Sequence, residues 1–274
     1  MELRAPHATG APEAEEGGSS VDTGTVRKLI ALNNRFYAEH AASFSATRSA
    51  PWAGWQRLAD ELRGRDWNAV ENDGARSVLD LACGNLRFER FLMDAFPELD
   101  LRFEAIDSCP ALADSTSTPG VLFRQFDILT ALLDGPRPAA LLKHTRNLTA
   151  CFGFMHHIPS EELRCRVLNT LIDATEPNGF ITLSFWQFMN DKRLAVKAER
   201  SGVPAAISPA KLEANDHFLG WQDDMRPLRY CHHFDEMEID RLVDSVAPRA
   251  HELSRWSADG TSGTLNRYLL LQRS

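Results

Sequence analysis

The stretch from Ser77 to Asn85, which reads SVLDLACGN, constrains the fold of this chain more than any other segment. A short apolar run ends close to the acidic Asp80, and small residues then lead into residues 87–96, which have the apolar spacing of a helix. This layout is typical of a buried parallel strand that delivers a tight turn beneath a nucleotide-like ligand. The stretch therefore predicts the first strand, turn and helix of an α/β sheet.

The same alternation of strand and helix continues along the chain. We expect strands at residues 77–82, 101–106, 121–126, 148–152 and 180–185, with helices at 87–96, 160–175 and 235–246. A turn at residues 177–179 should precede the fifth strand, and residues 251–256 and 265–271 read as a closing hairpin. This order predicts a Rossmann-like, doubly wound sheet of about seven strands with a C-terminal antiparallel hairpin.

Three segments lie outside this alternation. Residues 1–24 are rich in Ala, Glu, Gly, Ser and Pro, so we expect a disordered N-terminal tail. Helices expected at 25–43 and 51–62, the second with Pro51 at its first position, would form an N-terminal helical cap over residues 25–70. Residues 187–230 are too many for a simple connection and should form a substrate lid within a single domain, 25–274.

Composition excludes several classes of protein. The chain of 274 residues has a formal net charge of −8, which argues against nonspecific binding of nucleic acid but leaves room for an RNA held by a local basic patch. Its five cysteines form no CxxC pair, so neither a disulfide framework nor a structural zinc site is expected. The sequence has no signal peptide and no membrane-length apolar run, so we expect a cytoplasmic protein.

Acidic residues close three successive predicted strands: Asp80, Asp107 and Asp127. Ligands of open α/β sheets bind outside the carboxyl ends of the strands, and an acid after the second strand accepts ribose hydroxyls in dinucleotide folds. We therefore expect Asp107 to bind a ribose. The alternative for each residue is an ordinary turn acid, but three acids at one sheet edge favour a ligand site.

The turn also resembles a known motif. Asp80, Cys83 and Gly84 fit the pattern Asp-x-x-Cys-Gly-x-Gly of class I S-adenosylmethionine-dependent methyltransferases, although Leu86 stands where a further glycine is usual. The resemblance implies S-adenosylmethionine as the cofactor, with Asp127 at the adenine amine and Ile128 packed on the adenine ring. Completing the expected cofactor site are Ala82 and Phe152.

His156 and His157 follow the fourth predicted strand and face the expected position of the methyl group. Either histidine is able to accept a proton from the acceptor or to orient it. The alternative is that one caps the helix that begins near Ser160 while the other packs against the sheet. A metal role would need further ligands, which the sequence does not identify.

Residues 44–52 (FSATRSAPW) and 229–234 (RYCHHF), with 215–221 and 266–270, resemble the tRNA wobble-uridine methyltransferases, which esterify a 5-carboxymethyluridine. The resemblance implies that Arg48 and Arg229 hold the acidic acceptor. His232, with His156 or His157, would complete its pocket. A carboxylate is already anionic at neutral pH and needs no strong base. Eukaryotic members of that family work with a small zinc-binding activator subunit, so such a partner is a further possibility.

Three functions therefore stay open. The first is methylation of a carboxylate or related group on tRNA, and the second is the same chemistry on a small molecule, an O- or N-methyltransferase. The third is a non-catalytic subunit that binds the cofactor or nothing, for which Leu86 in place of glycine is the support.

Overall fold

The computed structural model of the protein describes residues 21–65, 67, 75–113, 118–135, 138, 143–222 and 226–274. Its centre is a seven-stranded sheet with the order β3-β2-β1-β4-β5-β9-β8. Strands β1 to β5 pair in parallel, whereas β9 runs antiparallel to β5 and β8 antiparallel to β9. These strands are β1 (Ala75–Leu81), β2 (Asp100–Asp107), β3 (Val121–Gln125), β4 (Arg146–Cys151), β5 (Thr175–Trp186), β8 (Ala250–Ala258) and β9 (Asn266–Arg273). The predicted fold class is confirmed.

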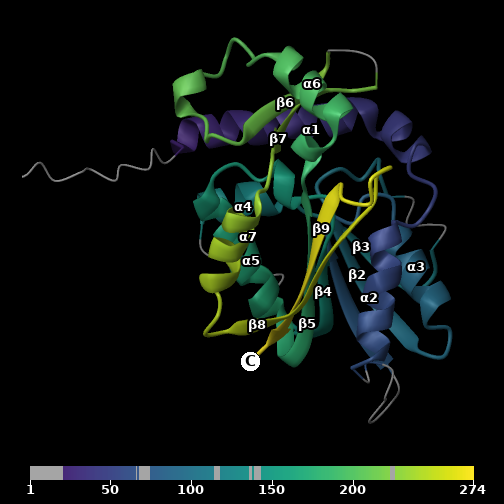
Figure 1. Cartoon of the computed structure of the whole chain (residues 1–274). Helices are drawn as coiled ribbons and strands as arrows, with labels where there is room; N and C mark the ends of the chain where they lie inside the picture. The colour runs from purple at the N-terminus through teal and green to yellow at the C-terminus, as the bar shows by residue number, and fades with distance from the viewer. Residues whose placement is uncertain are drawn as a thin grey trace, which may run out of the picture.

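Helices cover both faces of this sheet, as Figure 1 shows. One face carries α4 (Ile128–Asp134), α5 (Glu161–Ala174) and α7 (Glu236–Asp244), and the other carries α2 (Ala53–Arg63) and α3 (Arg87–Ala95). Each helical layer buries its apolar side chains against the sheet in a large hydrophobic cluster of its own. Burial on both faces explains the short apolar runs of the inner strands, such as Leu269–Leu271 of β9.

Two boundaries differ from the sequence prediction around the fifth strand. The predicted helix at 160–175 ends at Ala174, and Thr175 already belongs to β5. The predicted turn at 177–179 lies inside β5, where the pairing with β4 shifts register and Asn178 has a φ of 62°. The Pro-Asn-Gly sequence therefore makes an irregularity within the strand, because pairing resumes at Phe180.

The N-terminal helices also begin at other residues than predicted. α1 spans Thr23–Ala46, and the side chain of Asp22 caps it by accepting a hydrogen bond from the Thr25 amide, so the last two residues of the predicted tail are helical. Residues 1–20 lie outside the described residues. α2 begins at Ala53 after its N-cap Trp52, so Pro51 precedes the helix instead of opening it.

The expected lid segment has its own secondary structure. It contains α6 (Lys192–Ser201) and the hairpin of β6 (Asp216–Gly220) and β7 (Leu228–His232), which forms a separate two-stranded sheet. In Figure 1 this hairpin lies beside α1, above the edge of the main sheet. Asn33 of α1 fixes it there, because its side chain accepts from the Tyr230 amide at 2.8 Å and donates to the Tyr230 carbonyl at 3.1 Å.

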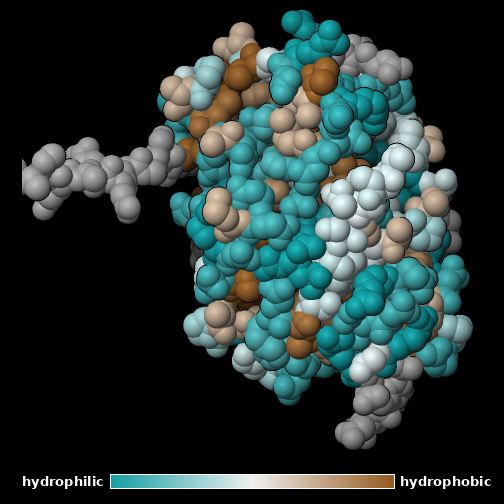
Figure 2. Space-filling view, viewed as in Figure 1, coloured by the Kyte–Doolittle hydropathy of each residue, from teal (hydrophilic) through white to brown (hydrophobic). Residues whose placement is uncertain are grey.

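Apolar side chains at the surface are scattered. Leu122, Val196, Val203 and Met237 are exposed and come from separate elements or connections. On the face drawn in Figure 2, hydrophilic residues predominate and apolar residues form small separate patches. In the described part of the chain, no helix has both the length and the apolar character needed to cross a bilayer.

Candidate active site

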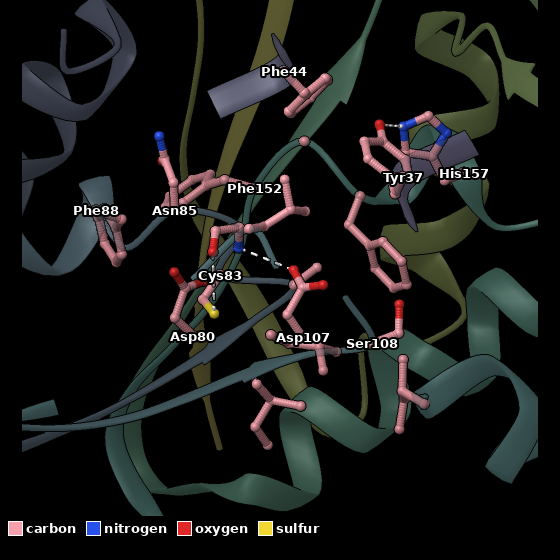
Figure 3. Close-up of a pocket in the computed structure, with 18 of the residues that line it drawn as sticks. Tyr37, Phe44, Asp80, Cys83, Asn85, Phe88, Asp107, Ser108, Phe152 and His157 are labelled. Atoms are coloured by element: carbon pink, nitrogen blue, oxygen red, sulfur yellow. Dashed lines mark hydrogen bonds between the residues drawn. The ribbon is translucent and has the colours of Figure 1, made fainter. Parts of the chain in front are cut away.

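A pocket opens where β1, β2 and β4 end, under the C-terminal half of α1 (Figure 3). Its empty volume is about 1090 Å³, open mouth included. The turn after β1 and the residues after β2 form one side, the segment after β4 forms another, and α1 with the segment that follows it covers them. The pocket therefore lies at the carboxyl ends of the parallel strands, where α/β sheets bind their ligands.

The turn after β1 depends on unusual backbone conformations. Ala82, Gly84 and Leu86 have φ values of 64°, 56° and 60°, in the left-handed region that favours glycine. A Cβ at Gly84 would meet no heavy atom within 4 Å, so the backbone there borders open space. Leu86 adopts the conformation that glycine would take, and its fully buried side chain packs with Cys83 and Ala105. Packing of the leucine therefore compensates for the strain at this position.

Asp107 ties this turn to the second strand. Its carboxylate accepts hydrogen bonds from the Gly84 amide at 3.0 Å and the Cys109 amide at 2.8 Å, and it lines the pocket (Figure 3). Burial raises the pKa of Asp107, and these backbone bonds oppose the shift. Asp80 also lines the pocket and is 3% exposed. Two of the three predicted acids thus lie together across the first two strands.

Asp127, the third acid, has a structural role that is visible in its contacts. Its carboxylate caps α4 by accepting from the Leu129 and Thr130 amides at 3.1 and 3.0 Å, and it also accepts from Asn34 of α1 at 2.9 Å. It still lines the pocket, as do the buried side chains of Ile128 and Phe152. Asp127 therefore has a local structural role, close to the alternative of an ordinary turn acid, and it also has a place in the pocket wall.

Helix α1 and the segment after it supply a wall that combines aromatic rings with one cation. The guanidinium of Arg48 lies over the ring of Phe44, with 3.5 Å between Cζ and the ring centroid. Burial lowers the pKa of Arg48 to about 10, so the guanidinium stays charged at neutral pH. Trp52 reaches the pocket from the N-terminus of α2 and stacks on Trp55. The predicted acceptor residue Arg48 is thus part of the pocket.

His157 also lines the pocket. Its Nδ1 donates to the Tyr230 carbonyl at 2.9 Å, so the unprotonated Nε2 is free to accept a bond of 2.7 Å from the Tyr37 hydroxyl. Burial and then the nearby charge of Arg229 lower the pKa of His157 to about 3. His156 does not line the pocket but stacks at an angle on His157 and Trp186, and burial lowers its pKa too. Both imidazoles are therefore neutral at pH 7.

Arg229 of β7 is a buried cation without an anion beside it among the described residues. It is 7% exposed, and its Nε and Nη1 have no hydrogen-bond acceptor. Its guanidinium carbon lies 5.3 to 5.6 Å from the ring centroids of Phe36, Trp186 and Trp221. It is close enough to Arg48 for the two positive charges to oppose each other. Two arginines predicted to hold the acceptor are thus brought together, although Arg229 does not itself line the pocket.

His232 lies away from the pocket in a network of charged groups. Its Nδ1 and Nε2 are each 2.7 Å from a carboxylate oxygen, of Asp216 and Glu238 respectively. Arg164 forms ion pairs with Glu238 at 2.9 Å and with Glu213 at 2.6 Å. The network joins the β6–β7 hairpin to α5 and α7. The structure therefore does not bring His232 to the acceptor pocket, where the sequence placed it, because its ring faces α7.

Two groups have the composition of a metal site in the described part of the chain: His156 with His157 and Cys231, and Glu213 with Asp216 and His232. In the first group His157 already bonds to Tyr37 and to the Tyr230 carbonyl, and in the second group Glu213 already pairs with Arg164. The charge of Arg229 beside the first group also disfavours a second cation there.

Sequence reasoning missed most of the wall that α1 contributes. Asn33 and Asn34 line the pocket, and Tyr37 lines it about one helical turn later. The detectable signal was the buried Asn33 inside the apolar stripe of a helix, since a buried amide needs partners.

Comparisons with known proteins agree with this geometry. Neither a protein family nor a curated protein matches the sequence. Solved structures do match. The structure described as the DhpI–SAM–HEP complex is 17% identical with a TM-score of 0.58, over 90% of this chain and 98% of that one. The Burkholderia thailandensis 1,6-didemethyltoxoflavin-N1-methyltransferase, with bound 1,6-didemethyltoxoflavin and S-adenosylhomocysteine, is 14% identical with a TM-score of 0.55, over 99% and 93%. An amino pentose methyltransferase from Micromonospora echinaspora, bound to SAM, is 14% identical with a TM-score of 0.52, over 86% and 96%.

This protein has the class I methyltransferase fold. The main sheet, with its terminal β8–β9 hairpin, carries this fold. Helix α1 and the separate β6–β7 hairpin are additions that lie above the pocket. The identities to the solved structures are low, so the similarity establishes the fold, whereas the chemistry has to be argued from the pocket.

Proposed function

We propose that the protein is an S-adenosylmethionine-dependent methyltransferase whose acceptor is anionic, foremost a carboxylate. The observation that carries the acceptor class is Arg229, a buried guanidinium with unpaired Nε and Nη1 beside a second arginine, Arg48. A buried charge without a partner is unfavourable, and an arginine grips a carboxylate through two parallel hydrogen bonds. An anionic acceptor that bound to Arg48 in the pocket wall and reached past it to Arg229 would supply the missing partner.

The residues of the pocket fit the cofactor. Asp107 would hold the ribose, with Ile128 and Phe152 packing on the adenine side, and the open space at Gly84 would admit the ligand next to the backbone. The Asp127 carboxylate, which already accepts the hydrogen bonds that cap α4, would also accept one from the adenine amine. When bound, S-adenosylmethionine supplies a methyl group on a positively charged sulfur, which an acceptor oxygen takes as the carbon–sulfur bond breaks.

The protonation states favour an acceptor that needs no base. Burial and Arg229 keep His157 neutral, with a pKa of about 3, and burial raises the pKa of Tyr37 to about 12. Neither group therefore exchanges protons near pH 7. A carboxylate is already a nucleophile at that pH, so orientation by Arg48, Arg229 and the Tyr37–His157 pair would account for much of the catalysis.

Two sources of the carboxylate have support. The resemblance of residues 44–52 to the tRNA wobble-uridine methyltransferases favours a 5-carboxymethyluridine, and Phe44, Ser45, Arg48 and Trp52 from that segment do line the pocket. Small molecules appear in the names of several solved structures with this fold, and the net charge of −8 opposes binding of a polyanion. We favour the small carboxylate because the charge and the buried position of Arg229 both suit it. The tRNA ester, with an activator subunit, is the second candidate.

The test compares cells with and without the gene. Because the enzyme is tested in cells, any activator subunit that it requires is present. Mass spectrometry of small acids and of tRNA nucleosides should reveal one methyl ester that is present in cells with the gene and absent from cells without it. Mild alkali should hydrolyse this ester to the free acid and methanol. An ester among the small acids supports the first candidate, and one on a tRNA nucleoside supports the second. A missing methyl group that resists alkali would contradict the carboxylate acceptor.

A further inference from the structure

Glu89 of α3 is a buried carboxyl with no donor beside it. It is 0% exposed, and neither of its oxygens meets an N–H or O–H group of the described residues. Glu104, a buried glutamate of β2, has two arginine partners, Arg124 and Arg146. Burial of an unpaired carboxylate is so unfavourable that such a group either finds a cation or keeps its proton.

The neighbour of Glu89 is the carboxyl group of Asp80, at the floor of the pocket. Burial, followed by the charge of Glu89, raises the pKa of Asp80 well above its usual range, and burial raises the pKa of Glu89 to about 7. Two adjacent carboxyls bond to each other only when one of them carries a proton, so the pair shares one. The other ionisable groups that face the pair are Asp107, Cys83, Cys151 and Arg90.

One member of this pair borders the space where a cofactor would bind. Asp80 lines the pocket, while its neighbour Glu89 does not line it and is fully buried. A cation that entered the pocket would therefore lie beside an acid group, and its charge would favour loss of the proton. Under the proposed function the ligands differ in charge, because the methyl donor carries a positive sulfur and its demethylated product carries a neutral one.

We propose that the Asp80–Glu89 pair holds a proton while the pocket lacks a cation and releases it to solvent when S-adenosylmethionine binds. Glu89 thereby favours the cationic donor over the neutral-sulfur product S-adenosylhomocysteine. After methyl transfer the positive charge is gone, and the pair takes up a proton again. The inference rests on the proposed function, since it concerns the same cofactor site.

Isothermal titration calorimetry in two buffers measures how many protons the protein releases when a ligand binds. We would titrate the full chain with S-adenosylmethionine at pH 7 in phosphate and in Tris, which differ in ionisation enthalpy. The wild type should release roughly half to one proton per donor bound and close to none with S-adenosylhomocysteine. Affinity for the donor should rise with pH, since deprotonation of the pair then becomes easier.

Two variants separate Glu89 from other sources of protons. Glu89→Gln keeps a hydrogen bond to Asp80 through its amide but removes the shared proton, so release should fall to near zero. Its preference for the donor over the product should fall on the order of tenfold, the effect of one nearby charge in a partly polar interior. Glu98→Gln, which changes an exposed carboxyl before β2, should behave like the wild type.

Donor binding with the same enthalpy in both buffers would overturn the inference and leave the proposed function intact. Equal proton release by Glu89→Gln and the wild type would also overturn it. If Glu89→Gln fails to fold, the buffer series on the wild type still decides. If neither the donor nor its product binds, the proposed function falls and takes this inference with it.

Discussion

The hydroxyl of Tyr37 donates a hydrogen bond of 2.7 Å to Nε2 of His157. This bond closes a chain that runs from α1 through the imidazole to the Tyr230 carbonyl of β7, and therefore fixes the inserted hairpin to the pocket. It also occupies the one imidazole nitrogen that is able to accept a proton. The histidine that the sequence offered as a base is thus held as an orienting group.

A pH profile tests this assignment. With His157 near pKa 3 and Tyr37 near pKa 12, neither group changes its charge between about pH 5 and pH 10. We expect kcat at saturating cofactor and acceptor to be nearly constant from about pH 5 to pH 9, below the pKa of about 10 at which Arg48 would lose its charge. Initial rates with the acceptor identified in cells provide the measurement, and a bell-shaped profile centred near neutrality would show that a general base operates.

Arg229→Ala removes the unpaired guanidinium from the acceptor side. Charge-assisted hydrogen bonds contribute about 1.5–3 kcal/mol, so kcat/KM for the acceptor should fall roughly 10- to 100-fold or more. The dissociation constant of the cofactor should stay within about twofold of the wild-type value, because the predicted cofactor residues lie on the strand ends. Arg193→Ala, on the exposed face of α6, is the matched control. An equal loss of kcat/KM in both variants would refute the binding of the acceptor carboxylate by Arg229.

Asp107→Ala should weaken cofactor binding by about 100-fold, since the carboxylate both orders the Gly84 turn and would accept the ribose. Calorimetric titration with S-adenosylhomocysteine measures the change. Asp100→Ala serves as the control, because Asp100 is exposed at the other end of β2. An unchanged affinity in Asp107→Ala would remove this residue from the site.

Gly54→Ala tests how the N-terminal cap packs on the C-terminal hairpin. A Cβ at Gly54 would lie 2.1 Å from the ring of Tyr268, which Asp259 holds by a hydrogen bond to its hydroxyl. The ring has to move, and we expect unfolding to require about 1–3 kcal/mol less free energy. Gly64→Ala, where the nearest atom is 3.5 Å from the new Cβ, should change stability little. Urea denaturation of both variants distinguishes the two, and equal stabilities would contradict the packing.

His232 should stabilise the protein more in mild acid than in alkali. Burial alone would lower its pKa, but the hydrogen bonds to Asp216 and Glu238 together raise it above the unfolded value of about 6.5. A raised histidine pKa gives stability that is complete below the unfolded pKa and disappears as the pH rises through the folded one. The stability lost in His232→Gln should therefore be largest near pH 6 and smaller near pH 9. His251→Gln, at an exposed position of β8, should show no such trend in urea denaturation. A loss that grew with pH would contradict the sign of the shift.

The sequence by itself determined the sheet and the strand-end acids. Periodic apolar runs are local signals that the sequence records. Because parallel strands bring their carboxyl ends to one edge, Asp80, Asp107 and Asp127 line one pocket. The inserted hairpin escaped prediction because its short strands pair only with each other and depend on α1 for support.

Only the tertiary structure decided which of the candidate polar groups lack partners. Arg229 is buried and unpaired because three rings from α1, β5 and the segment after β6 surround it, while His232, three residues later on the same strand, is fully paired with carboxylates. Glu89 looks in the sequence like any polar residue of an amphipathic helix, yet it lies without a cation beside Asp80. Whether a charge is paired depends on contacts between segments far apart in the chain, and no local pattern records those contacts.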